Sequence, residues 1–173
     1  MRLSAEILSS AEQRCNPLGE WELILRDRGI PTVEHLGVTR DAFDAMDFSN
    51  NRIVSLDNFP RLQRLCHLEL AGNLIEYLDA NNLKKNIPNL STLILTDNRL
   101  SNLSQIATMG KTWTKLEYLC LKGNPVTRKL YPMEQNTRGK ERRETEAETL
   151  LFSPSSSSRC FQDTFLERKL VHT

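Results

Sequence analysis

The chain lacks any long hydrophobic run and any excess of charge of one sign. Its 173 residues include 23 lysines and arginines against 22 aspartates and glutamates, a formal net charge of +1. A membrane-spanning helix needs about 20 consecutive apolar residues, and the apolar runs here are only a few residues long. The start of the chain is too polar for a secretory signal. We therefore expect an intracellular protein with no membrane contact, whose partners recognise local surface rather than a bulk field.

The sequence also lacks the patterns of metal sites, disulfide frameworks and catalytic centres. It has three histidines and four widely spaced cysteines, with no C-x-x-C pair: Cys15, Cys66, Cys120 and Cys160. G-x-S-x-G, the P-loop, G-x-G-x-x-G and H-E-x-x-H are absent. We accordingly expect no catalytic residues, no metal and no cofactor.

One pattern, L-x-x-L-x-L-x-x-N-x-L, occurs four times. The copies begin at Phe43, Leu65, Leu90 and Leu116, and their asparagines are Asn51, Asn73, Asn98 and Asn124. A degenerate fifth copy precedes them, with Arg28 at the asparagine position. This is the leucine-rich repeat pattern, and it predicts an α/β fold: a right-handed horseshoe solenoid with a parallel β-sheet on the concave face.

Each repeat position has a physical reason. Side chains alternate faces along a strand, so Leu68 and Leu70 should point inward while His67, Glu69 and Ala71 point outward. The asparagine ends the strand, and its amide can satisfy backbone groups left unpaired by the turn. We therefore expect the four asparagines to form a ladder through the stacked coils.

The repeats divide the chain into three expected parts. Ser4 is a plausible N-cap, and near-helical apolar spacing up to Cys15 predicts a helix over residues 4–15. We expect residues 1–19 to form an N-terminal capping helix, residues 20–131 about five solenoid coils, and residues 132–173 a polar tail. Residues 132–158 should be flexible, and residues 160–173 form at best a weak helix, which could fold back on the last full repeat.

The tail carries interleaved positive and negative charges over residues 134–148. Its interleaved charges are typical of a solvated segment, with RNA contact as a lesser alternative. The candidate residues for that contact are Arg138, Lys140, Arg142 and Arg143.

The repeat register predicts which side chains face the concave surface. The central column is Ile24, Asp47, Glu69, Ile94 and Cys120, and columns through Tyr118 and Lys122 flank it. Asp47 and Glu69 should both be exposed and adjacent, which is mildly unfavourable without a compensating cation. This half-acidic, half-apolar surface predicts an amphipathic partner helix that carries Lys or Arg. The alternative is that these polar residues only solvate the strand face, as in any soluble repeat protein, and bind no partner.

Two blocks go beyond a generic repeat. They are Gly29-Ile30-Pro31-Thr32-Val33-Glu34-His35-Leu36-Gly37 and Met46-Asp47-Phe48-Ser49 with the residues around it. Together with Ile87-Pro88-Asn89-Leu90 and Asn124-Pro125-Val126-Thr127, they resemble the U2 small nuclear ribonucleoprotein A-prime family over about residues 1–131. After Tyr131 the sequence departs from the leucine-rich capping stretch of that family.

The resemblance implies a nuclear, non-enzymatic scaffold of the U2 snRNP in pre-mRNA splicing. Family members grip a helix of an RNA-recognition-motif (RRM) protein of the B-double-prime type in the concave face, and the pair binds a U2 snRNA stem-loop. Other spliceosomal proteins are also implied as partners. Carried over to this sequence, the groove residues are Arg26, Asp47, Glu69, Ile94, Tyr118 and Lys122.

Other functions remain open from the sequence. A cytoskeletal or ciliary repeat adaptor that binds tubulin or motor subunits would share the coil pattern but not the block at residues 29–59. A phosphatase-regulating nuclear repeat protein would have more regular repeats or a long acidic tail. An enzyme has no supporting constellation.

Overall fold

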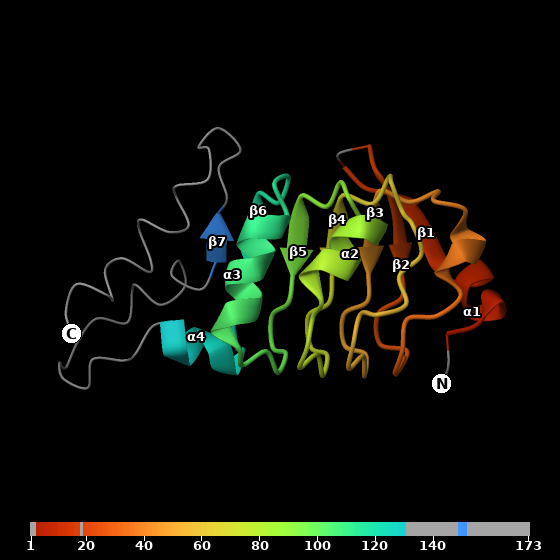
Figure 1. Ribbon diagram of the computed structural model, residues 1–173. Helices are drawn as coiled ribbons and strands as arrows, with labels where there is room; N and C mark the ends of the chain where they lie inside the picture. Colours follow the sequence, from red (N-terminus) through yellow and green to blue (C-terminus); the bar gives the residue numbers. More distant parts are fainter. Residues whose placement is uncertain (1–2, 18, 131–148, 152–173) are drawn as a thin grey trace, which may run out of the picture.

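The computed structural model describes residues 3–17, 19–130 and 149–151, which form a row of stacked coils with one continuous sheet (Figure 1). The sheet has seven strands in sequence order. The inner strands run parallel: β2 (Trp21–Ile24), β3 (Ala45–Asp47), β4 (His67–Glu69), β5 (Thr92–Ile94) and β6 (Tyr118–Cys120). At the two edges, β1 (Glu12–Cys15) and β7 (Thr149–Leu151) are antiparallel to their neighbours.

Helices α2 and α3 cover one face of the sheet (Figure 1). The helical segments are α1 (Ala5–Ser9), the 3-10 helix η1 (Leu36–Thr39), α2 (Ala80–Asn86), α3 (Leu103–Thr112) and α4 (Pro125–Leu130). Asp79 caps α2 by accepting hydrogen bonds from the N–H groups of Asn81 and Asn82, and Asn102 caps α3 in the same way through Ser104. Among the residues described, no helix is long and apolar enough to span a membrane.

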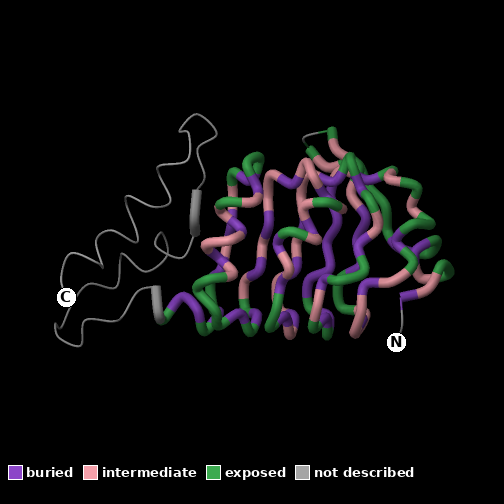
Figure 2. Tube along the Cα trace, in the orientation of Figure 1, coloured by how far each residue is buried: buried purple, intermediate pink, exposed green. Residues whose placement is uncertain are grey.

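The alternation expected from the repeats is present in the strands. In β4, Leu68 is buried between the half-buried His67 and Glu69, and β5 and β6 show the same order. Buried and more exposed stretches alternate along the stacked coils (Figure 2). Leu68 lies opposite Leu93 in the sheet register, and Leu93 lies opposite Leu119. The predicted register of the outward-facing columns is confirmed at every strand from β2 to β6.

The core is a continuous apolar layer between the sheet and the helices. Leu83 of α2, Ile106 and Met109 of α3, and Trp113 just after α3 are all buried. Each fully buried side chain of this size contributes about 1.5–3 kcal/mol. Because each coil buries its apolar face against its neighbours, stability depends on stacking along the whole row.

The four repeat asparagines lie buried where the chain leaves the strands, and each joins two coils. The Asn73 Oδ1 atom accepts a hydrogen bond of 3.0 Å from the Ile53 N–H of the preceding coil. Its Nδ2 atom donates to the carbonyl of Phe48, also in the preceding coil, at 2.9 Å and to that of Leu70 at 3.0 Å. The same pattern recurs at Asn51, Asn98 and Asn124.

The predicted helix over residues 4–15 is wrong in its second half. Ser4 does cap a helix, with its Oγ atom 3.3 Å from the Ile7 nitrogen, but α1 ends at Ser9. Residues 12–15 instead form β1, all of them exposed, paired antiparallel with β2. The open edge of β2 presents unpaired backbone N–H and C=O groups, and β1 satisfies them. That requirement outweighs the weak helical spacing of the sequence.

The opposite edge of the sheet is also closed. The expectation of a flexible segment over residues 132–158 is wrong at Thr149–Leu151, which pair with β6 so that Leu150 is in register with Leu119. Like the edge of β2, the edge of β6 presents backbone N–H and C=O groups that need hydrogen-bonding partners, and β7 provides them. The remainder of that segment, and the stretch expected to be a weak helix at residues 160–173, lie outside the described residues.

Candidate protein-binding face

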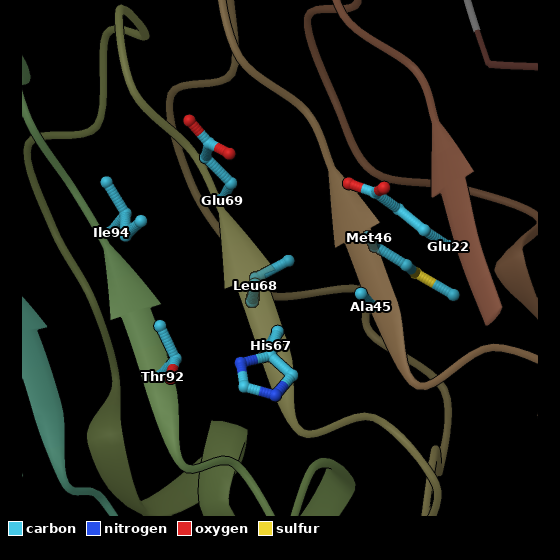
Figure 3. Close-up of a pocket in the computed structure, with 8 residues that line it drawn as sticks. All are labelled: Glu22, Ala45, Met46, His67, Leu68, Glu69, Thr92 and Ile94. Carbon is cyan, nitrogen blue, oxygen red and sulfur yellow. The ribbon is translucent and has the colours of Figure 1, made fainter. Parts of the chain in front are cut away.

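The concave face, meaning the face of the sheet opposite α2 and α3, holds a hollow between β2 and β5 (Figure 3). Its lining mixes carboxylates, a histidine and apolar side chains: Glu22, Ala45, Met46, His67, Leu68, Glu69, Thr92 and Ile94. The hollow exists because the strands place residues of the same register position side by side. Glu69, for example, is in register with Asp47 on one side and with Ile94 on the other.

Asp47 does not offer its charge to a partner, which corrects the expectation that it is exposed. The residue is only 1% exposed. Its Oδ1 atom accepts a hydrogen bond of 2.8 Å from the Ser49 N–H, and Oδ2 pairs with the guanidinium of Arg26. The hydrogen bond to Asp47, and then its charge, raise the pKa of Arg26. Neighbouring strands and the Arg26 side chain cover the carboxylate, and repeat register alone does not reveal such cover.

Glu69 is the carboxylate that remains available on this face. Its side chain is half-buried, and it forms no ion pair with any residue that the structure describes. Burial raises the pKa of Glu69, and the negative charge of Asp47 raises it further. A cation placed against Glu69 would therefore relieve an unfavourable environment in this protein.

Two more side-chain pairs lie at the N-terminal end of the concave face. The Arg14 Nε atom lies 2.7 Å from Oε2 of Glu22. The Nε2 atom of His67 lies 2.9 Å from Oε1 of Glu20. The first pair raises the pKa of Arg14, chiefly through the hydrogen bond to Glu22.

Arg14 and Glu20 also belong to this face, although the repeat pattern does not predict them there. Both lie here because β1 folds back on β2, with the backbone N–H of Asn16 donating to the carbonyl of Glu20 at 2.9 Å. The available signal was the turn chemistry of Asn16-Pro17 followed by Gly19, between two short segments able to form strands.

The C-terminal half of the concave face is less charged. Ile94 is half-buried and in register with Cys120, while Thr92 is in register with Tyr118. The Thr96 hydroxyl lies 3.3 Å from the Cys120 sulfur. Lys122 is exposed just after β6. Thus Arg26 and Asp47 form a pair, Glu69 and Ile94 are neighbours, and Tyr118 and Lys122 lie at the far end.

The remaining candidates fall elsewhere. The four repeat asparagines are structural in their contacts, since they are buried and hydrogen-bonded between coils. The candidate RNA-contacting residues of the tail lie outside the described residues: Arg138, Lys140, Arg142 and Arg143. Within the part of the chain that is described, no group of three or more His, Cys, Asp or Glu residues could hold a metal ion.

Known proteins are similar to this chain in both sequence and fold. The leucine-rich repeat family model matches residues 1–135. U2 small nuclear ribonucleoprotein A' of Mycosarcoma maydis is 45% identical over 128 residues, which are 74% of this chain and 51% of that protein. The human U2 small nuclear ribonucleoprotein A' is 41% identical over 129 residues, 75% of this chain and 50% of its own. The chain thus spans about half the length of these curated relatives.

A solved structure gives the same result in three dimensions. The crystal structure of the Drosophila melanogaster SNF/U2A' complex matches with a TM-score of 0.70 and 41% identity, over 73% of this chain and 72% of the matched one. The predicted leucine-rich repeat solenoid is confirmed. The chain belongs to the leucine-rich repeat family, and the relatives that it resembles within that family are U2 small nuclear ribonucleoprotein A' proteins.

Proposed function

We propose that this chain is a non-catalytic scaffold of the U2 snRNP in pre-mRNA splicing and acts in the nucleus. Its concave face binds a helix of an RRM protein of the B-double-prime type. The resulting pair binds a stem-loop of U2 snRNA, with the RRM protein supplying most of the base-specific contacts.

The observation that carries the proposal is the position of Glu69 beside Ile94. Glu69 has no ion pair among the described residues, and Ile94 is in register with it on the next strand. An amphipathic helix laid across the sheet could place a Lys or Arg on Glu69 and an apolar residue on Ile94. Tyr118 adds an aromatic side chain with a polar tip, a residue type common at binding hot spots.

Two arginines of the face already have carboxylate partners in the absence of a binding protein. Arg26 is fixed by Asp47 and Arg14 by Glu22, both across neighbouring strands. A surface whose side chains are already ordered loses less conformational entropy on binding. We infer that Asp47 contributes to binding by positioning Arg26, whereas Glu69 contributes by direct contact.

The names of similar proteins, and the complex in which one of them was solved, support this proposal. The matched solved structure is a complex of U2A' with SNF, and the curated relatives carry U2 snRNP names. The matched region includes the whole of the concave sheet from β2 to β6. The proposed binding surface therefore lies inside the part of the chain that matches the leucine-rich repeat family.

A tagged pull-down from nuclear extract, performed with and without ribonuclease, tests the proposal. We expect an RRM protein that is retained after ribonuclease treatment, together with U2 snRNA that is lost. Recovery of tubulin or motor subunits without U2 snRNA would contradict the proposal and favour the cytoskeletal alternative. Substitution Glu69→Lys should remove the RRM protein, while Asp57→Lys, an exposed charge reversal in the loop after β3, should not.

A further inference from the structure

The edge where the chain enters strands β4, β5 and β6 is strongly cationic. Segments 61–65, 84–91 and 111–117 hold six lysines and arginines and one acidic residue, Glu117. Arg64 is neutralised by Asp44 at 2.8 Å. The others form what we call the basic rim: Arg61, Lys84, Lys85, Lys111 and Lys115.

Contacts between consecutive coils hold the basic rim together. The Lys115 Nζ atom donates to Oδ1 of Asn89 at 2.6 Å, and Asn89 Nδ2 donates to the Gln63 carbonyl at 2.7 Å. Lys84 donates to the Pro88 carbonyl at 2.9 Å. These bonds join the loops that precede β4, β5 and β6 into one surface, beside the ends of α2 and α3 where Lys85 and Lys111 lie.

The five cations of the basic rim form no ion pair within the described residues. Other described cations, such as Arg28 and Arg52, also have no carboxylate partner, so what distinguishes the rim is the grouping of its cations on three successive coils. Burial lowers the pKa of Lys84, and the charge of Lys115 lowers it further. Two ammonium groups are thus close enough to repel each other, a situation that an anion would relieve.

We propose that the basic rim binds the phosphate backbone of RNA directly. A nucleic-acid strand presents a phosphate at every step, which suits a row of cations on three successive coils. Lysine and arginine side chains are common phosphate contacts that carry no sequence information. An acidic protein surface, the competing partner, would usually offer cations as well as carboxylates. Few carboxylates at the rim could meet those cations: Glu117 lies within its segments, and Asp41 beside them already accepts hydrogen bonds from the Gln63 and Arg64 N–H groups.

The position of the basic rim is compatible with the complex proposed above. The identity of the RNA as U2 snRNA rests on that proposed function. Lys115 precedes Tyr118 by three residues, so the rim borders the concave face along the column of His67, Thr92 and Tyr118. RNA held by an RRM protein seated in that face would meet the rim at its border. The RRM protein then reads the bases while the rim adds affinity that depends on salt.

The test compares two variants with the same loss of charge. The rim variant combines Arg61→Ala, Lys85→Ala, Lys111→Ala and Lys115→Ala, all exposed positions. The control combines Arg28→Ala, Arg52→Ala, Arg99→Ala and Arg128→Ala, where the chain leaves the strands. Fluorescence anisotropy measures binding of a labelled U2 snRNA 3′ stem-loop to the full chain, alone and with the RRM protein, from 50 to 300 mM salt. Binding of the RRM protein without RNA is measured separately.

We expect the rim variant to bind the RNA on the order of 10- to 100-fold more weakly, with a salt slope smaller by about three to four. Binding of the RRM protein alone should be unchanged, so that failure of the proposed complex is visible independently. If no RRM protein binds the chain, we still expect the rim variant to show the same loss of RNA affinity when the chain is measured alone. Equal losses of RNA affinity in the rim and control variants would overturn the proposal. Binding to poly-glutamate, a probe for an acidic protein partner, is measured as well: unchanged RNA binding together with weaker poly-glutamate binding in the rim variant would also overturn it.

Discussion

The guanidinium of Arg26 covers the carboxylate of Asp47, which is 1% exposed although it belongs to the central column of the concave face. Its neighbour in register, Glu69, has no such cover. Two carboxylates that look equivalent in the repeat pattern therefore have different roles. Reversing both charges together would confound folding with binding, so the two residues are best tested apart.

We predict that Asp47→Ala destabilises the fold while Glu69→Ala does not. Loss of the buried carboxylate removes the acceptor for the Ser49 N–H and the partner of Arg26, which should cost about 1–3 kcal/mol. Glu69→Ala should stay within about 0.5 kcal/mol, because this half-buried side chain has no ion pair among the described residues and its burial disfavours its charge. Urea unfolding measures both, and equal effects would contradict the distinction.

The asparagine ladder predicts a large effect of a single substitution. Asn73→Ala leaves the buried Ile53 N–H and the Phe48 and Leu70 carbonyls without their side-chain partner. Each unsatisfied buried group costs about 1–3 kcal/mol, so we expect a total of about 3 kcal/mol after relaxation. Asn58→Ala, at an exposed position, is the matched control. A similar small shift of the urea midpoint in both variants would argue against the ladder.

The raised pKa of Glu69 leads us to predict that the free energy of unfolding depends on pH. Because its pKa is raised in the folded state, folding favours the protonated form. The contribution of this group is thus fully present below the ordinary glutamate pKa and is lost as pH rises through the raised value. Glu69→Gln should remove that loss.

The measurement is urea unfolding of the two proteins over the acid range up to neutral pH. The stability of Glu69→Gln relative to the unmodified chain should increase as pH rises through that window. A difference that stays constant with pH would show that the environment of Glu69, including Asp47, Arg26 and Glu22, does not disfavour its charge.

The β1 hairpin predicts an effect on self-association. Arg14 lies opposite Glu22 in the antiparallel pair, and Arg14→Pro removes a backbone donor from the strand that closes the edge of β2. We expect lower stability and concentration-dependent oligomers by light scattering. Arg14→Ala removes only the exposed ion pair and should leave the oligomeric state unchanged, with a change in stability of at most about 1 kcal/mol. Oligomers in both variants, or in neither, would contradict this role of β1.

Much of the architecture could be predicted because repeats impose it. The spacing of Asn51, Asn73, Asn98 and Asn124 sets the coil length, and strand alternation then gives the register of every outward-facing column. The edges could not be predicted in the same way. All four residues of β1 are exposed, so no hydrophobic pattern marks that strand. Both β1 and β7 pair with strands whose backbone edges would otherwise lack partners.

The register of the concave face was predictable for strands β2 to β6, but the exposure of its side chains and the residues contributed by the β1 hairpin were not. Register places Asp47 beside Glu69, but whether a carboxylate is free depends on which long side chain reaches it. Arg26 reaches Asp47, and Glu20 reaches His67 only because the hairpin positions it there. Such contacts depend on three-dimensional neighbours rather than on spacing along the chain.

The central claim is that Glu69 is the carboxylate through which the concave face binds an RRM protein. The most direct test is isothermal titration of a purified B-double-prime-type protein into the full chain and into Glu69→Lys and Asp57→Lys, after equal urea midpoints show that all are folded. We predict unchanged binding for Asp57→Lys and at least a 10-fold loss for Glu69→Lys, about 1.4 kcal/mol or more. Undiminished binding by Glu69→Lys would contradict the claim.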